Sequence, residues 1–144
     1  ADQVRSAASE MQARLGAALT GFTLQPQLKG QELIVGVVRD AGFGPAVLLA
    51  WGGIYAEAMA RRALLPCPIS PAQAHAMIGQ IDPRGVLSGY RTGQALAVEA
   101  LAELLVAVSR LAAANPWLEE LDLNPVIVSG KGCRAVDWVM VAGG

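Results

Sequence analysis

Charge is scarce in this sequence, and neither sign dominates it. Only 16% of the 144 residues are charged, and the formal net charge is −1. Without a basic excess, the chain has little to attract a nucleic acid or an anionic membrane surface. Aromatic residues make up only 5%, which argues against a platform on which nucleic-acid bases stack. We therefore expect neither a nucleic-acid nor a membrane partner.

The sequence also has few of the residues that bind zinc or form disulfides. Its two cysteines, Cys67 and Cys133, lie far apart, and its single histidine, His75, has no cysteine near it in the sequence. This spacing disfavours both a zinc site and a disulfide framework. Two isolated thiols fit a reducing compartment, so we expect a cytoplasmic protein. We expect His75 to be a surface or packing residue.

No stretch has the uninterrupted hydrophobicity of a membrane span. The most apolar long stretch, residues 95–114, contains three charged residues, which is typical of a buried amphipathic helix. Residues 1–20 carry charges throughout and do not read as a signal peptide. Hydrophobic residues nevertheless reach 53%, which is enough to fill one core in a chain of this length.

Apolar periodicity predicts an α+β domain in which helices pack on a mostly antiparallel sheet. Leu33 to Val38 is apolar on both faces, as expected of a central strand. The segment 54–70 predicts a short helix or an irregular connection. Helices are expected over 1–20, 71–79 (beginning at Ser70-Pro71) and 93–114. Strands are expected as a pair around Lys29-Gly30 within 22–40, and over 46–51, 119–128 and 133–141.

Three polar residues interrupt the last apolar hairpin, and two of them face each other. If Gly130-Lys131 forms the turn, regular pairing places Asn124 opposite Asp137, with their Cβ atoms roughly 5 Å apart. Asp122 and Glu120 share the face of Asn124. Oxygen ligands without His or Cys suit Mg²⁺ or Mn²⁺ that shares a nucleotide's phosphates. The alternatives are a solvated polar face, or a bulge at the following proline that shifts the register by one residue.

Several motifs together resemble one family. They are "KGQELIVGVVRDAGFGPAVLLAWGG", "AEAM", "GYR" and "ELDLNPVIV…GCRAVDW". They resemble the ATP-grasp domain of NDP-forming acyl-CoA synthetases, such as ADP-forming acetyl-CoA synthetase and, more distantly, the β subunit of succinyl-CoA synthetase. The resemblance covers residues 21–142, and its most specific parts are Glu32 to Pro45 and Glu120 to Pro125.

The resemblance implies a ligase that links a carboxylic acid to CoA, using ATP/ADP and Mg²⁺ or Mn²⁺, through an acyl phosphate and a phosphohistidine. It also implies a role for each of several residues in this sequence. Asn124 and Asp137 are implied as metal ligands, Asp122, Glu57, Arg39 and Arg91 as catalytic residues, and Gly52 and Gly53 as the loop that meets phosphates.

For the candidate residues outside the hairpin, a structural role without function remains an alternative. Glu57 could be an exposed residue beside Arg61. Arg39 could form a strand-end ion pair with Asp40, which would contribute little stability. Arg91 has the same two readings as Arg39.

Parts of the family's enzymes have no counterpart in this sequence. The earlier ATP-grasp subdomain, with its phosphate-contacting lysines, is missing, as are the CoA-binding domain and the phosphohistidine segment. We therefore expect residues 1–144 to be one unit, the C-terminal subdomain of an ATP-grasp domain in a longer protein. Its partners would be the remaining synthetase domains and a nucleotide, and it could form a homodimer. By itself it would be inactive.

The glycine loop departs from the family's usual Gly-x-Gly-Gly. Here it reads Ala50-Trp51-Gly52-Gly53, and Trp51 would narrow the space for phosphates. An altered loop is compatible with an alternative function. In that alternative the chain is a regulatory, synthetase-like domain of a bacterial protein-lysine acetyltransferase.

Overall fold

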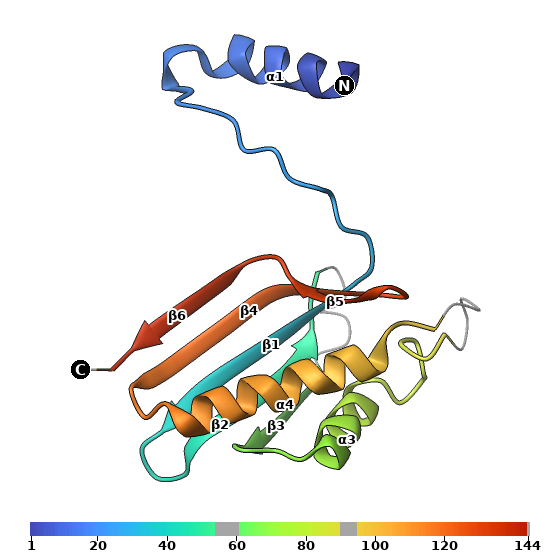
Figure 1. The fold of residues 1–144 in the computed structure, drawn as a ribbon, viewed down its shortest axis with the longest axis vertical. Coiled ribbons are helices and arrows are strands. Elements are labelled where there is room, and N and C mark those ends of the chain that lie inside the picture. Colours follow the sequence, from blue (N-terminus) through green and yellow to red (C-terminus); the bar gives the residue numbers. More distant parts are fainter. Residues whose placement is uncertain (54–60, 90–94, 144) are drawn as a thin grey trace.

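One antiparallel sheet, covered on one face by two helices, forms the body of the protein (Figure 1). The computed structural model describes residues 1–53, 61–89 and 95–143. Strand order is β3-β2-β1-β4-β5, with β6 also paired to β4. The expected α+β fold is confirmed. The strands are β1 (Gln31–Asp40), β2 (Gly44–Trp51), β3 (Arg62–Pro66), β4 (Leu118–Ser129), β5 (Gly132–Ala135) and β6 (Trp138–Ala142). The helices are α1 (Asp2–Leu15), the 3-10 turn η1 (Gly16–Ala18), α3 (Pro71–Ile81) and α4 (Val98–Ala114).

β1 is the central strand, as its two apolar faces predict. It pairs with β2 on one side and β4 on the other. Leu33, Val35 and Val37 point into the helix-covered face and are fully buried. Fully burying each such side chain stabilises the fold by about 1.5–3 kcal/mol, so β1 anchors the core.

α3 and α4 supply the other wall of the core. α3 starts where the sequence predicts, because the Ser70 hydroxyl accepts the Gln73 N–H and the Gln73 side chain accepts the Ser70 N–H. In α4, Leu101 and Leu105 are fully buried, whereas Leu111 is 40% exposed. None of the described helices is long and apolar enough to cross a membrane.

β4 contains a bulge that changes which residues face the core. Leu33 pairs with Val126 and Val35 with Leu123, so Asn124 and Pro125 together lie opposite the single residue Ile34. A one-residue insertion switches the face to which every later side chain points. Leu121 on one side of the bulge and Val126 on the other are therefore both buried, although their positions differ in parity.

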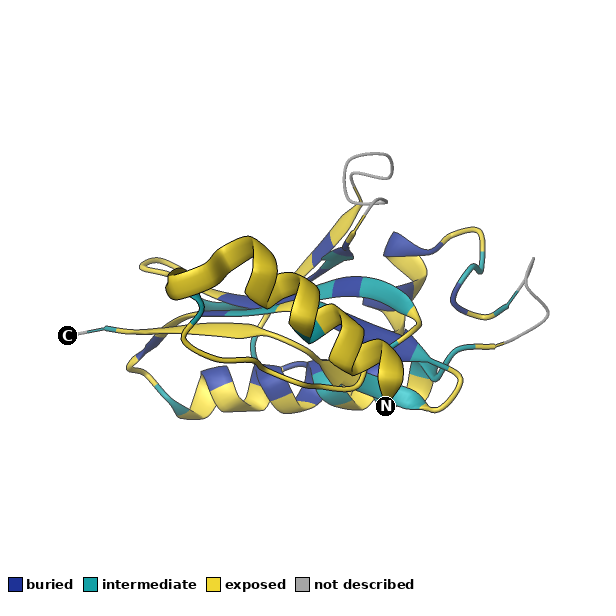
Figure 2. Cartoon of the chain, turned by 90° about the horizontal axis from the view of Figure 1, so that it is seen from above, coloured by how far each residue is buried: buried dark blue, intermediate teal, exposed yellow. Residues whose placement is uncertain are grey.

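α1 lies apart from the sheet. Residues 19–30 join it to β1 as an extended segment, and no residue of α1 is buried. Figure 2 shows the helix almost entirely in the colour of exposed residues. Its apolar stripe is open to solvent, since Val4 is 47%, Met11 51% and Leu15 53% exposed.

Four expectations from the sequence are wrong. The segment 22–28 is not a strand, because no described strand lies beside it to complete its hydrogen bonds. Residues 62–66 are a strand, β3, paired with β2, where a helix or irregular connection was expected; residues 54–60 are outside the described part. The last hairpin strand is divided into β5 and β6. α4 begins at Val98, and residues 95–97 before it are not helical.

Two aspartates hold loops in the same way but differ in burial. The carboxylate of Asp82 is 8% exposed and accepts the N–H groups of Val86 and Leu87 at 2.8 and 2.7 Å. The carboxylate of Asp40 is exposed and accepts those of Gly42 and Phe43 at 2.7 and 2.9 Å. Water can replace Asp40 but has little access to the partners of Asp82.

We predict that Asp82→Ala lowers the free energy of unfolding by about 2–4 kcal/mol, because it leaves two shielded donors without an acceptor. Asp40→Ala is the matched control and should cost about 1 kcal/mol or less, since solvent satisfies its donors. Urea unfolding of both variants, followed by tryptophan fluorescence, measures the difference. Equal losses in the free energy of unfolding would contradict the claim that burial of the donors makes Asp82 the more important residue.

Candidate functional site

The last hairpin places Asn124 beside Asp137, as the turn at Gly130-Lys131 predicts. Ser129 pairs with Gly132, and the pairing continues without a shift through Leu123 and Trp138. Between β5 and β6 the Asn124 N–H donates to the Asp137 carbonyl at 3.2 Å. The predicted register is therefore confirmed on this side of β4. The bulge shifts the register only against β1.

The alternation of side chains between the two faces of the sheet switches in both strands of the hairpin where these two residues lie. In β4 the switch occurs at the bulge, and in the opposite strand it occurs between β5 and β6. Asn124 and Asp137 are both exposed. One Asp137 carboxylate oxygen accepts the Trp138 N–H at 2.8 Å, which orients the carboxylate. Bulges of this kind often redirect side chains next to functional sites.

Asp122 lies one pleat from Asn124 on the face of the sheet away from the helices. It alternates with the core-facing Leu121 and Leu123, and its partners across the sheet are Gly36 and Val139. Gly36 is buried, and a Cβ there would lie 3.2 Å from the Leu121 carbonyl oxygen and 3.9 Å from the Leu48 side chain. The close packing of the strands beside Asp122 therefore favours glycine at this position.

The two loop glycines pack against the start of β1. The Gly52 N–H donates to the Glu32 carbonyl at 3.0 Å, so this N–H extends the hydrogen bonding between β2 and β1. Gly53 has φ 58°, a conformation that favours glycine, and the Glu32 carboxylate fills the place where a Gly53 side chain would begin. The loop glycines therefore adjoin a carboxylate that the sequence reasoning did not single out as functional.

A pocket of about 510 Å³ lies beside the hairpin. Pro125, the residue after Asn124, lines it, and so does Glu32, the residue against which Gly53 packs. The segment before β1 forms another wall, through Gln25 to Leu28. Sequence analysis missed these wall residues because it assigned them to a strand. The only signal was the proline and glutamine composition of the segment, which is unfavourable for a central strand.

Arg39 lies at the other end of β1 and has a clear structural partner. Its guanidinium donates to three carbonyl oxygens, those of Ala112 and Asn115 at 3.0 Å and that of Leu118 at 2.9 Å. A cation there satisfies the unpaired carbonyls that end α4 and opposes the negative end of the helix dipole. The structure does not bring Arg39 together with Asn124 and Asp137. The ion pair with Asp40, which the sequence left open as an alternative, is not formed.

A model of the ATP-grasp domain matches residues 1–142. The chain belongs to the ATP-grasp family. The resemblance noted in the sequence is confirmed, and the relatives of this ATP-grasp chain include ADP-forming acetyl-CoA synthetases.

Sequence relatives of the ATP-grasp chain are acid–CoA ligases. Acetate–CoA ligase [ADP-forming] I of Archaeoglobus fulgidus is 37% identical over 88% of this chain, which spans 19% of the relative. The β subunit of acetate–CoA ligase [ADP-forming] I of Pyrococcus furiosus is 38% identical over 78% of this chain and 48% of the subunit. The chain thus spans a fifth to a half of these relatives' length.

A solved structure shares both sequence and fold. Acetyl-coenzyme A synthetase 1 of Ca. Korarchaeum cryptofilum, in complex with coenzyme A and Mg-AMPPCP, is 33% identical and superposes with a TM-score of 0.74. The match covers 81% of this chain and 55% of that one. With a phosphorylated phosphohistidine segment, the same protein gives a TM-score of 0.78 over 98% of this chain and 66% of that one.

Asn124 and Asp137 together could provide only part of a coordination sphere for a divalent ion. Among the described residues, no group of three or more His, Cys, Asp or Glu side chains is placed to hold a metal. The facing pair offers one amide oxygen and a carboxylate. That set fits Mg²⁺, which keeps several waters and takes further oxygens from phosphates. It does not fit a site in which protein alone surrounds the ion.

The remaining candidates lie elsewhere in the ATP-grasp chain. Glu57 and Arg91 fall outside the described residues. His75 is exposed, and its Nε2 lies 3.2 Å from a Glu99 carboxylate oxygen on α4. The expectation of a surface residue is confirmed for His75.

Burial makes both thiols of the ATP-grasp chain poor nucleophiles. Burial raises the pKa of Cys133 to about 11. It also raises the pKa of Cys67, although the nearby Arg39 charge works in the opposite direction. Only the thiolate is nucleophilic, so neither cysteine suits covalent catalysis near neutral pH.

We predict that iodoacetamide alkylates Cys133 far more slowly at pH 8 than it alkylates an unfolded control. The raised pKa keeps the thiol protonated, so the rate should climb as pH rises towards 11. Mass spectrometry of the intact Cys67→Ser variant, with and without urea, reports the rate at one site. Rapid modification of the folded protein at pH 8 would contradict the shift.

Proposed function

We propose that this chain is the Mg²⁺- and nucleotide-binding C-terminal part of the ATP-grasp domain in an ADP-forming acyl-CoA synthetase. The whole enzyme would join a carboxylic acid to CoA with ATP, through an acyl phosphate and a phosphohistidine. The observation that carries the proposal is the pairing of Asn124 with Asp137 at the break in the hairpin. The chain alone would not catalyse, because the rest of the nucleotide cleft lies in other domains.

The hairpin would hold the metal. The amide oxygen of Asn124 and the carboxylate of Asp137 project from an exposed stretch of neighbouring backbone, where a hydrated ion has access. When bound, the ion would neutralise charge on the nucleotide phosphates. Asp122, on the face of the sheet away from the helices, would face the transferring phosphoryl group or the histidine that carries it.

The pocket beside Pro125 supports a nucleotide next to this ion. It is about 510 Å³ and adjoins Asn124 through Pro125, a size in the range of small-molecule sites. Glu32 and two glutamines provide hydrogen-bonding side chains on its walls, and Leu28 and Ile127 provide apolar surface. Gly53, beside Glu32, would let the loop approach phosphates closely.

The names of the relatives specify different acids. Belonging to this family therefore does not identify the acyl group that the whole enzyme would use. One relative is named a 4-hydroxybutyrate–CoA ligase and another a trans-feruloyl-CoA synthase. The alternative of a regulatory domain in a protein acetyltransferase rests on the altered loop, whose residues 54–60 are not described. No described contact favours it.

We predict that Mn²⁺ broadens the amide signals of residues 122–124, 126 and 136–139 before others in the NMR spectrum of the ¹⁵N-labelled chain. Asn124→Ala and Asp137→Ala should each raise the Mn²⁺ concentration needed for equal broadening by about tenfold, since each removes an oxygen ligand. Glu103→Gln, on the exposed face of α4, is the control and should change nothing there. If neither hairpin substitution changes the Mn²⁺ concentration needed for broadening, Asn124 and Asp137 do not bind the metal.

We also predict that isothermal titration of the isolated chain with Mg-ATP gives weak or no binding, with a dissociation constant above about 1 mM. The reason is that one subdomain provides only one side of the proposed cleft. A tight, stoichiometric isotherm would show that this part binds the nucleotide unaided and would contradict the half-site proposal.

A further inference from the structure

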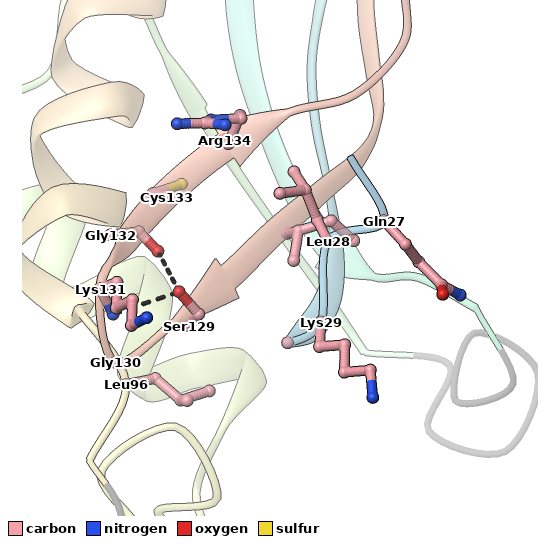
Figure 3. A pocket seen from close by; sticks show the side chains of 12 residues that line it. Gln27, Leu28, Lys29, Leu96, Ser129, Gly130, Lys131, Gly132, Cys133 and Arg134 are labelled. Carbon is pink, nitrogen blue, oxygen red and sulfur yellow. Dashed lines mark hydrogen bonds between the residues drawn. The ribbon is translucent and has the colours of Figure 1, made fainter. Parts of the chain in front are cut away.

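Three cationic side chains line a second pocket, and no acidic side chain lines it (Figure 3). The pocket lies at the tip of the β4–β5 hairpin, where residues 27–30 pass beside it, and has a volume of about 720 Å³. Its cations are Lys29, Lys131 and Arg134. They come from two segments about 100 residues apart in sequence, so the fold, and not a local charge run, gathers them.

These three cationic groups make no ion pair and no side-chain hydrogen bond within the described part of the chain. Arg39, by comparison, is satisfied by three carbonyls. Like charges gathered without a counter-charge repel one another and raise the local concentration of anions. A carboxylate, that of Glu32, lines the adjoining pocket, which shares Arg134 as well as Gln27, Leu28 and Ile127 with this one.

The same pocket has an apolar wall. Leu28, Leu96 and Ile127 line it together with the half-buried Cys133, whose pKa is too high for it to add charge near neutral pH. The Ser129 hydroxyl is already engaged, because it accepts the Lys131 N–H and lies 3.4 Å from the Gly132 carbonyl oxygen. The polar side chains left for recognition are the three cations and Gln27, and the apolar surface suits an organic group.

We propose that this pocket binds a phosphorylated organic molecule through Lys29, Lys131 and Arg134. Arginine pairs with two phosphate oxygens at once, and lysine acts as a point charge. The apolar wall would hold the organic part of the ligand. Ser129, beside Lys131, is five residues along β4 from Asn124, which is about 17 Å, whereas Arg134 pairs with Ile127, three residues or about 10 Å from Asn124. Cationic side chains do not coordinate a metal ion, so binding here needs no divalent metal.

Phenyl phosphate tests the proposal, with EDTA present to exclude divalent ions. Titration into the ¹⁵N-labelled chain should shift the amide signals of residues 28–30 and 129–134. The double variant Lys131→Gln/Arg134→Gln should weaken binding at least tenfold. The matched control Arg84→Gln/Arg110→Gln loses the same charge at exposed positions away from the pocket and should bind like the parent. Equal losses of affinity for phenyl phosphate in both double variants would show that only the net charge of the chain matters, and would contradict the proposed site.

Two further measurements separate the parts of the claim. Inorganic phosphate should bind at least tenfold more weakly than phenyl phosphate; equal affinity would overturn the role of the apolar wall. The Lys131→Gln/Arg134→Gln variant should still show Mn²⁺ broadening at Asn124 and Asp137, and Asn124→Ala should still bind phenyl phosphate. Loss of phenyl phosphate binding in Asn124→Ala would contradict a site that works without a metal. Loss of Mn²⁺ broadening alone in that variant is the result expected from the proposed metal site and leaves the phosphate pocket intact.

Discussion

One extra residue in β4 allows a single sheet to hold both the core and the candidate site. Leu121 and Leu123 precede the bulge at odd positions, and Val126 and Val128 follow it at even ones. In a regular strand these two pairs would face opposite sides of the sheet. The bulge opposite Ile34 brings both pairs onto the helix-covered face. Without it, either half of β4 would expose its apolar side chains.

The bulge also explains why polar residues are tolerated in so apolar a hairpin. At the bulge the ladder to β1 is interrupted, and the partner strand is interrupted between β5 and β6. Asn124 and Asp137 occupy this shared interruption, where side chains reach solvent and need no partner in the core. The cost of placing Asn and Asp in strands is therefore small at this point, and a ligand can approach without displacing packed residues.

The sequence predicted what local chemistry determines and missed what depends on distant partners. The hairpin register followed from the Gly130-Lys131 turn, and the start of α3 followed from the Ser70 cap. β3 was missed because its five residues end at Pro66 and are a strand only through pairing with β2. The segment 22–28 has an alternating pattern, but no strand in the described part of the chain pairs with it. The contacts of Arg39 join residues more than 70 positions apart, a separation that no local pattern reveals.

The isolation of α1 has a consequence for how this chain unfolds. A helix of 14 residues with no buried side chain is only marginally stable in water, since tertiary packing supplies most of a helix's stability. The cooperative folding unit therefore begins at β1, about thirty residues into the chain. Circular dichroism would register the early melting of α1, while the tryptophans at positions 51 and 117, both within the folded body, would report a later transition. Two probes of one chain would thus give two different midpoints.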